Sequence, residues 1–204
     1  MLQENCYVVS DDSKECIIID CGAFYDGEVE AILTYIRDNS LTPVHLVGTH
    51  GHLDHHFGDY AIHQAYGLCP EVHPLDQDLT ANLNRQAEDL LGMTLPHPTP
   101  SLGDSLEEAR GLTFGHHHLN VIHTPGHSGG SVCLYSEEEK VLFTGDTLFR
   151  SSIGRTDFKE GNMMLMIQSL RTLAQLPDDI VIYPGHGPST TMGYELHTNP
   201  FLDR

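Results

Sequence analysis

The stretch THGHLDHHFG, residues 49–58, places four histidines and one aspartate within seven consecutive positions. The histidines are His50, His52, His55 and His56, and the aspartate is Asp54. So many titratable side chains are unusual for a buried core and for an ordinary surface loop. Neutral imidazole and carboxylate are, however, the usual nitrogen and oxygen ligands of zinc and of non-haem iron. The segment therefore predicts a metal site.

Three further metal-binding side chains follow strand-like apolar runs elsewhere in the chain. His127 ends VIHTPGH (121–127), Asp146 ends VLFTGD (141–146) and His186 ends VIYPGH (181–186). In each case a glycine-containing turn separates the run from the histidine or aspartate. Because loops at strand ends are where scaffolds of this class usually assemble a site, we expect these side chains to join the 49–56 segment.

The remaining histidines are not expected to bind metal. Six stand alone in the sequence and are expected at the surface, or partly buried with hydrogen-bond partners: His45, His63, His73, His97, His123 and His197. The triplet at 116–118 is expected to form an exposed turn, because adjacent strand residues point to opposite faces. His56 is expected to support a neighbouring ligand or to begin a helix.

The elements that must position these residues are strands with helices between them. Seven β-rich runs predict strands at 5–9, 15–20, 44–49, 119–124, 130–136, 140–145 and 179–185. Helical periodicity predicts helices at 26–39, with Asp26 as N-cap, at 75–91, with Gly92 as C-cap, and at 160–176. The methionines of the last helix, Met163 and Met166 among them, are expected in the core. This order predicts an α/β fold, with sheets covered by helices, in one domain spanning 1–204.

Composition restricts the partners. Ten basic against 29 acidic residues give a formal charge of −19, which disfavours nucleic acid and anionic membranes. No apolar run approaches the ~20 residues of a membrane span, and the N-terminus lacks the features of a secretory signal. Five scattered cysteines without a C-x-x-C pair indicate a reducing compartment, so we expect a cytoplasmic protein with a small-molecule substrate.

Four motifs in order resemble those of the metallo-β-lactamase superfamily: THGHLDH (49–55), TPGHS (124–128), TGDTLF (144–149) and YPGHG (183–187). Two more segments, GDTLFRSSIGRTDF (145–158) and ELHTNPFL (195–202), resemble the glyoxalase II-like, or hydroxyacylglutathione hydrolase-like, enzymes, particularly their short single-domain members. The resemblance implies an αββα sandwich, in which two mixed β-sheets are flanked by helices and the metal site lies at one edge. Members of that family generally begin with a further short strand ahead of the segment equivalent to 5–9, so the resemblance leaves open whether this edge strand is missing here.

The resemblance carries over a ligand set for two divalent metal ions, with zinc expected and iron or manganese as alternatives. It assigns one ion to His50, His52 and His127, the other to Asp54, His55 and His186, and the bridging position to Asp146. Asp54 is also the catalytic residue, which orients a metal-bridging hydroxide. Asp20 either contacts the ligands from behind or forms a turn, and Arg155 either contacts the site or forms a structural ion pair.

The implied reaction is hydrolysis of a thioester, such as S-lactoylglutathione, or of a related ester. Two-domain glyoxalase II enzymes bind glutathione partly with a C-terminal helical domain, whereas only residues 187–204 follow His186 here. Basic groups for the glutathione carboxylates are limited to Arg150, Arg155 and Lys159. The helix at 75–91 and the proline-rich loop at 92–105 are expected to cover the site.

Other activities stay open at this point. The persulfide dioxygenases share the fold and hold one iron with the positions equivalent to His50, His127 and Asp146, so they are the main alternative. A lactonase or other esterase and a non-catalytic metal-binding protein are further alternatives. The antibiotic-degrading enzymes lack an aspartate at the position of Asp146, which disfavours β-lactamase activity. The oligomeric state cannot be predicted from these residues.

Overall fold

Two mixed β-sheets form the centre of the molecule in a computed structural model that describes residues 3–202. The first sheet has the strand order β1-β2-β3-β4, where β1 is antiparallel to β2 and the other neighbours are parallel. Its strands are β1 (Tyr7–Ser10), β2 (Glu15–Ile19), β3 (Thr42–Val47) and β4 (Pro70–Glu71). Ahead of β1, Glu4 forms an isolated antiparallel bridge with His186.

The second sheet has the order β12-β11-β8-β7-β6-β5. Its strands are β5 (Leu112–Phe114), β6 (His117–His123), β7 (Val132–Ser136), β8 (Val141–Gly145), β11 (Val181–Pro184) and β12 (Thr190–Thr191). Only β8 and β11 are parallel neighbours in this sheet. A short antiparallel pair, β9 (Leu148–Phe149) and β10 (Ser152–Ile153), follows β8. All seven predicted strands are present, with ends displaced by at most two residues.

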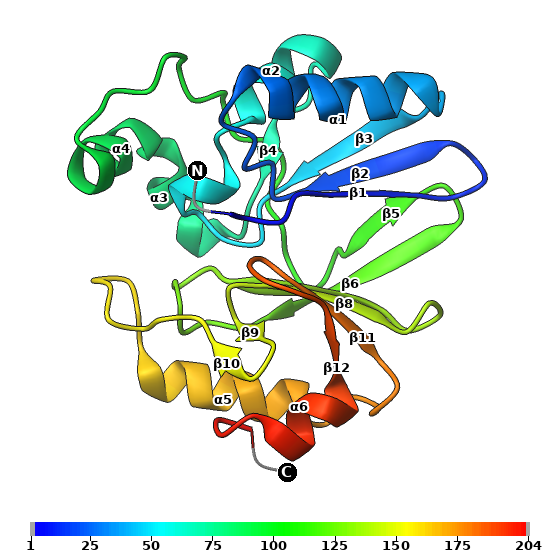
Figure 1. The fold of residues 1–204 in the computed structure, drawn as a ribbon, viewed down its shortest axis with the longest axis vertical. Coiled ribbons are helices and arrows are strands. Elements are labelled where there is room, and N and C mark those ends of the chain that lie inside the picture. The colour runs from blue at the N-terminus through cyan, green and yellow to red at the C-terminus, as the bar shows by residue number, and fades with distance from the viewer. Residues whose placement is uncertain (1–2, 203–204) are drawn as a thin grey trace.

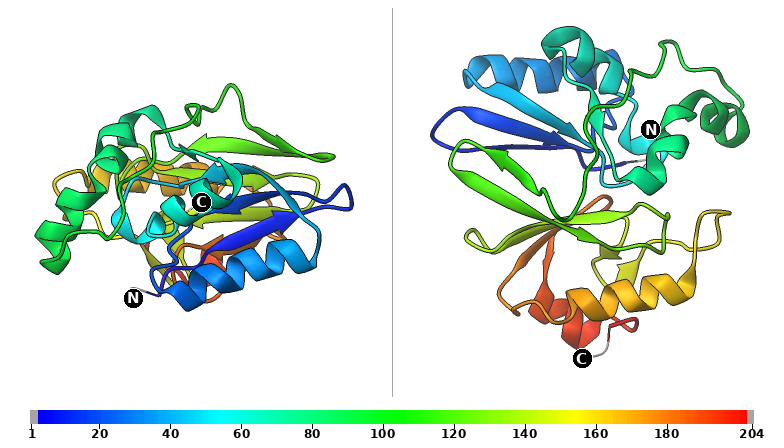
Figure 2. Two further views of the ribbon diagram at one scale, coloured as in Figure 1. Left: turned by 90° about the horizontal axis from the view of Figure 1, so that it is seen from above. Right: turned by 180° about the vertical axis from the view of Figure 1, so that it is seen from behind.

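Helices cover the outer face of each sheet (Figures 1 and 2). Helices α1 (Asp26–Asp38) and α2 (Asp59–Tyr66) lie on the first sheet, and α5 (Met163–Leu173) and α6 (Met192–Thr198) lie on the second. This is the αββα sandwich that the resemblance implied. The assignment of 1–204 to one domain stays a prediction. Within residues 3–202, no helix is long and apolar enough to cross a membrane.

The period-2 alternation of strand side chains divides the core into layers. In β2, Ile17 and Ile19 pack between the two sheets, whereas Ile18 faces the opposite way and packs under α1 and α2. The inter-sheet layer also contains Val47, Val121, Leu134 and Phe143. A third cluster, with Leu142, Met166, Leu170 and Ile182, lies between the second sheet and its helices. The sheets therefore form a rigid base for the loops that leave their edge.

His45 of β3 connects the two sheets. Its Nδ1 lies 2.5 Å from Glu71 Oε1 in β4, and its Nε2 lies 3.2 Å from the Thr113 carbonyl oxygen in β5. Both partners can only accept, so both ring nitrogens must donate and the imidazole is cationic. The hydrogen bond to Glu71 accordingly raises the pKa of His45 above its ordinary value of 6.5, although partial burial opposes the shift.

Replacing His45 by glutamine is expected to lower the free energy of unfolding by about 1–3 kcal/mol at pH 6 and by less at pH 9. Because the folded-state pKa is raised, the stabilisation is complete below about pH 6.5 and disappears as pH rises through the folded pKa. Urea unfolding at both pH values measures the difference, with His116→Gln at the exposed 116 position as control. An equal loss at both pH values would contradict the cationic form.

Several details differ from the sequence-based predictions. The N-cap of α1 is Tyr25, not Asp26, because the Glu28 carboxylate accepts from the Phe24 and Tyr25 amides and fixes the helix start there. In α5, Asn162 accepts from two first-turn amides and starts the helix late, which leaves Met163 44% exposed and outside the core, unlike Met166.

The predicted helix 75–91 is divided into η2 (Pro74–Asp76), α3 (Gln77–Ala81) and α4 (Leu83–Leu91). Asn82 interrupts it, since its side-chain amide donates to the Asp78 carbonyl oxygen and its backbone leaves the helical region. The expected apolar stripe is incomplete, because Leu75 and Leu90 are 65% and 59% exposed. The end at Gly92, which has a left-handed φ of +64°, is confirmed.

The triplet at 116–118 is only partly a turn, because β6 begins at His117 and pairs with β5. Seven short elements, whose sequences have no strong hydrophobic pattern, were not predicted: α2, α6, β4, β5, β9, β10 and β12. All five cysteines are free thiols, as their spacing indicated.

Candidate metal centre

The loops that carry the predicted ligands leave the same edge of the sandwich. β6 is antiparallel to β7, β7 is antiparallel to β8, and β8 is parallel to β11, so β6, β8 and β11 run in one direction. Their C-terminal ends therefore meet at one edge. The loop after β3 reaches this edge from the other sheet, where the Thr49 carbonyl oxygen accepts from the Val132 amide at 2.8 Å.

His50, His52 and His127 form the first group of the centre, with one nitrogen of each within 4.8 Å of the others. All three are buried. The Thr49 hydroxyl donates to Asp20 Oδ2 and so can only accept from His50 Nδ1, which lies 3.1 Å away. His50 therefore carries its proton on Nδ1, and its buried Nε2 is a free acceptor without a protein partner.

His127 is oriented in the same way. Its Nδ1 donates to the Arg155 carbonyl oxygen at 2.8 Å, which leaves the lone pair of Nε2 directed at His52 Nδ1, 2.7 Å away. Burial and the neighbouring His127 lower the pKa of His52 to about 3, and burial holds the pKa of His50 well below its ordinary value. His50 and His52 are therefore neutral at pH 7, the protonation state in which imidazole binds metal.

Asp54, His55 and His186 form the second group, also within 4.8 Å of one another. Asp54 and His55 belong to the short helix η1 (Leu53–His55). His186 Nδ1 donates to the Gln3 carbonyl oxygen, so its Nε2 faces Asp54 Oδ2 at 3.3 Å. Burial of His55 would lower its pKa, but the carboxylates of Asp20 and Asp146 outweigh this effect and raise it. The carboxylates around this group thus favour positive charge within it.

Asp146 lies between the two groups. Its Oδ2 is 3.5 Å from His127 Nε2 and 3.6 Å from His186 Nε2, while its Oδ1 is 3.5 Å from His55 Nε2. Burial opposes ionisation of Asp146, but the surrounding histidines, His55 first, lower its pKa. Two glycines are required beside it: Gly145 has a left-handed φ of +45° and packs against Thr49, and a Cβ on Gly185 would lie 2.4 Å from Asp146 Oδ1. The position is that of a bridging carboxylate.

The donor set fits divalent metal. His50 Nε2, His55 Nε2 and Asp146 Oδ1 are buried without a hydrogen-bond partner, and all three belong to one group of potential ligands. Buried polar atoms are rarely left unpaired, since the loss of hydration is costly, and bound cations would satisfy all three. The structure thus brings together all seven residues proposed as ligands. Their role as ligands stays a prediction.

Asp20 lies directly behind the ligands, with a left-handed φ of +52°. Its two oxygens accept from the Thr49 amide at 2.7 Å and from the Thr49 hydroxyl at 2.9 Å, and Oδ2 is 3.1 Å from His55 Nδ1. One buried carboxylate therefore orients His50, through Thr49, and His55. Both features left open by the sequence are present: the contact with the ligand candidate His55, and a turn in which the Asp20 carbonyl oxygen accepts from the Gly22 amide at 3.1 Å. The role of Asp20 stays a prediction.

Arg155 contributes its backbone to the site rather than its charge. Its carbonyl oxygen accepts from His127, while its guanidinium forms two hydrogen bonds with Asp157, at 2.7 and 2.8 Å. The same guanidinium lies 4.2 Å above the Phe158 ring. The structural ion pair considered from the sequence is therefore present.

Two supporting residues were missed in the sequence. The buried Asp76 accepts from the Gly51 and Gly130 amides and the Ser128 hydroxyl, at 2.8, 2.6 and 2.5 Å, and so joins the two loops that carry the first group. Gln86 of α4 donates to the Gly51 carbonyl oxygen and accepts from Leu53. Both residues bind backbone atoms that are distant in sequence, and such contacts cannot be predicted from residue type.

Replacing Asp76 by alanine is expected to lower the free energy of unfolding by about 3 kcal/mol or more, because three buried donors lose their acceptor. Metal content should fall as well, since Gly51 lies between His50 and His52. Urea unfolding and elemental analysis measure the two effects, with the exposed Asp78→Ala as matched control. A loss below about 1 kcal/mol would show that Asp76 does not hold the loops together.

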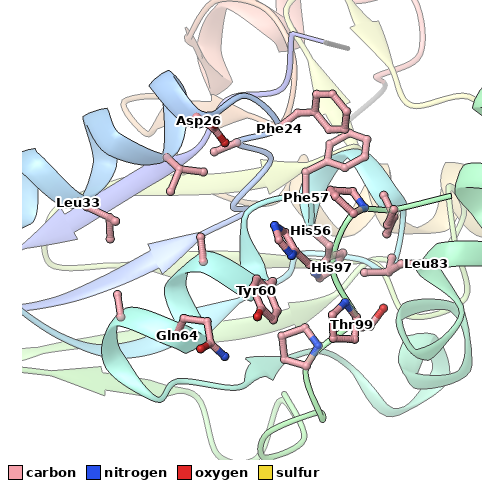
Figure 3. Close-up of a pocket in the computed structure, with 18 of the residues that line it drawn as sticks. Phe24, Asp26, Leu33, His56, Phe57, Tyr60, Gln64, Leu83, His97 and Thr99 are labelled. Atoms are coloured by element: carbon pink, nitrogen blue, oxygen red, sulfur yellow. The ribbon is translucent and has the colours of Figure 1, made fainter. Parts of the chain in front are cut away.

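A cavity of 680 Å³ opens directly onto the centre, with His52, Asp54, His127, Asp146 and His186 in its wall. Helix α4 lines it, as expected, but the loop 92–105 does not. Residues 95–100 of that loop instead line a separate cavity of 470 Å³ beside α1 and α2, where His97 stacks on Tyr60 (Figure 3). His56 lies in that wall and donates to the His50 carbonyl oxygen at 2.8 Å, so it supports a neighbouring ligand candidate, as expected.

Among the described residues, the six isolated histidines lie outside the groups of potential metal ligands. His63 and His197 contact nearby carbonyl oxygens through Nδ1, and His73 stacks on His123.

Comparison with known proteins decides the family. The model of the metallo-beta-lactamase superfamily matches residues 1–186, which include all seven residues of the centre. The chain belongs to this superfamily. Hydroxyacylglutathione hydrolase GloC of Haemophilus influenzae is 38% identical over 98% of this chain and 93% of its own.

Two solved structures of similar identity share the fold. The BLEG-1 B3 metallo-beta-lactamase is 36% identical with a TM-score of 0.88, covering 100% of this chain and 96% of its own. TTHA1623, in a di-iron-bound form, is 37% identical with a TM-score of 0.86, covering 98% and 96%. The family and the fold class read from the motifs are thus confirmed.

Proposed function

We propose that this chain is a binuclear metallo-hydrolase that cleaves a thioester of the S-(2-hydroxyacyl) thiol type, such as S-lactoylglutathione, or a related ester. The observation that carries the proposal is the position of Asp146, whose two oxygens lie 3.5 Å from His127 and from His55, one in each ligand group. The similarity to hydroxyacylglutathione hydrolase GloC supports the thioester.

Two divalent ions, zinc or alternatively iron or manganese, would supply a hydroxide nucleophile near neutral pH and polarise the substrate carbonyl. A pair of ions accords with the di-iron form of the relative TTHA1623. His50, His52 and His127 would hold one ion, Asp54, His55 and His186 the other, and Asp146 both.

Asp54 is the residue that we propose orients the nucleophile. It lies in the cavity wall, and His186 and His55 lower its pKa although burial opposes this, so it is an ionised acceptor at neutral pH. A hydrogen bond to this carboxylate would fix the attacking oxygen opposite the carbonyl carbon. Apolar side chains of the cavity, among them Phe149 and Phe158, would exclude bulk water. A thiolate leaves without protonation, so no separate acid is needed.

The proposed partner is a small molecule rather than nucleic acid or a membrane, in keeping with the formal charge of −19. The free cysteines fit the cytoplasm as the proposed location.

The test is a thioesterase assay on protein reloaded with zinc, iron or manganese. Hydrolysis of S-lactoylglutathione is monitored as the loss of its thioester absorbance. Turnover that a chelator abolishes and metal restores is expected. Absence of turnover with every thioester and ester tested, despite full metal content, would contradict the proposal.

β-Lactam hydrolysis is the second candidate, because the similar BLEG-1 is described as a B3 metallo-beta-lactamase. The expectation from Asp146 is that this activity is weak or absent. An assay of a chromogenic cephalosporin in parallel with the thioester ranks the two activities. A higher kcat/KM for the cephalosporin would make β-lactam hydrolysis the first candidate.

A further inference from the structure

The cavity of 470 Å³ beside α1 and α2, which we call the side cavity, lies apart from the metal centre (Figure 3). None of the described residues in its wall also lines the 680 Å³ cavity at the centre. Its volume falls within the range of about 300–1,000 Å³ that is typical of small-molecule sites. The proposed hydrolysis leaves this space without a role.

Short side chains on one helix keep the side cavity open. A face of α1 that runs from Asp26 to Leu33 lines one side, since residues three and four apart share a face of a helix. Helix α2 contributes Ala61 and Ala65, whose methyl groups do not fill the space between the helices. The third wall is the segment 95–100, in which three prolines restrict the backbone.

Two contacts fix the segment 95–100 in place. The His97 ring stacks on the Tyr60 ring of α2, with the ring centroids 4.4 Å apart and the planes at 7°. The Leu95 amide donates to Asn84 Oδ1 at 3.0 Å, and the Leu95 side chain packs against buried side chains of α4. Because this wall is formed without a ligand, binding costs little conformational entropy.

Aromatic rings form another part of the wall. Phe24 and Phe57 meet edge to face, with the ring centroids 4.8 Å apart and an interplanar angle of 69°. Tyr60 lines the cavity from α2. Such rings bury the apolar body of a ligand, and their π faces attract a cation.

The side cavity has carboxylates but neither lysine nor arginine among the described residues of its wall. Asp26 and Glu30 line it one turn apart on α1, whereas His56 is already paired with Asp59 at 2.7 Å. Glu30 lies 4.0 Å from the Arg37 guanidinium. No basic group lies within 4.0 Å of the Asp26 carboxylate in the described part of the chain. A cationic ligand would supply the positive charge that this carboxylate lacks.

We propose that the side cavity is a binding site for a small hydrophobic amine. The apolar body of the amine would lie among the aromatic rings, and its ammonium group would lie beside the carboxylates of Asp26 and Glu30. Because His56 in the wall donates to the His50 carbonyl oxygen, an occupied site would adjoin the metal centre without reaching it. The inference does not depend on the proposed hydrolysis.

The experiment uses indoles as probes, because the chain contains no tryptophan and an added indole can be followed by its own fluorescence. Metal-loaded protein is titrated with tryptamine, which is a cation at pH 7, and with tryptophol, its neutral analogue of the same size. Fluorescence anisotropy should saturate at about one tryptamine per chain. The Kd of tryptamine should be about threefold to tenfold below that of tryptophol, as expected for two exposed charge pairs.

Two kinds of variant separate charge from space. Asp26→Asn combined with Glu30→Gln should weaken tryptamine binding about threefold to tenfold and tryptophol binding less than about twofold. Ala61→Phe should abolish saturable binding of both indoles, because the phenyl ring fills the cavity. Ala65→Phe, at a more exposed position of the same wall, repeats this test in case Ala61→Phe fails to fold.

Glu137→Gln and Ala109→Phe are the matched controls, since both positions are exposed and lie outside the side cavity. Both should bind tryptamine as wild type does. Equal or tighter binding of tryptophol by wild type, the absence of saturable tryptamine binding, or tryptamine binding that persists in the folded phenylalanine variants of α2 would each overturn the proposal.

Discussion

Replacing Asp146 by alanine is expected to lower the metal content from about two ions per chain to below one and to reduce thioester kcat/KM by about a thousandfold or more. The carboxylate of Asp146 lies beside both ligand groups, at 3.5 Å from His127 and from His55. Without it, two nearby cations would lose the negative charge that offsets their repulsion.

Asp146→Asn separates charge from shape, because asparagine retains one oxygen and the size of the side chain. This variant is expected to keep more metal than the alanine variant, because one side-chain oxygen remains. It is expected to lose the charged carboxylate that would bridge the two ions. Asp179→Ala, at an exposed ion pair, is the matched control and should keep both metal and activity. Unchanged metal content in Asp146→Ala would refute the bridging role.

Replacing Asp54 by asparagine is expected to reduce kcat about 10²- to 10⁴-fold while the first ligand group still binds its ion. The amide cannot serve as an ionised acceptor, although it retains an oxygen toward the second group. Asp54 is 3.3 Å from His186 and lies in the cavity wall, so the substitution affects the reacting side of the centre.

Metal content and kcat must be measured on the same Asp54→Asn preparation. A large loss of kcat with metal retained supports the orienting role. Full activity with metal retained would contradict the mechanism, whatever the identity of the metal. Asp157→Asn, at a side chain that pairs with the exposed Arg155 guanidinium, is a control of the same chemistry.

The sequence was most informative where residue type and strand ends coincide. His127, Asp146 and His186 each follow a strand, and β6, β8 and β11 run in one direction, so a local pattern fixes a shared position in space. The strands were predicted correctly because short apolar runs rich in β-branched residues seldom form other secondary structure.

The rest depends on contacts that no local pattern records. Asp76 and Gln86 hold the loop around Gly51 through backbone atoms, and ordinary helix-forming sequence gives no sign of that. Asn82 separates α3 from α4 within one predicted helix, because its side chain competes for the Asp78 carbonyl oxygen. The charge on His45 follows from acceptors on two other strands.

The most direct test of the central claim is the metal content of wild-type protein purified without chelator or added metal. Elemental analysis should find about two ions per chain of zinc, iron or manganese, or reach two after reloading. One iron per chain that cannot be raised to two by reloading would contradict the binuclear centre and favour a mononuclear iron enzyme of the persulfide dioxygenase type.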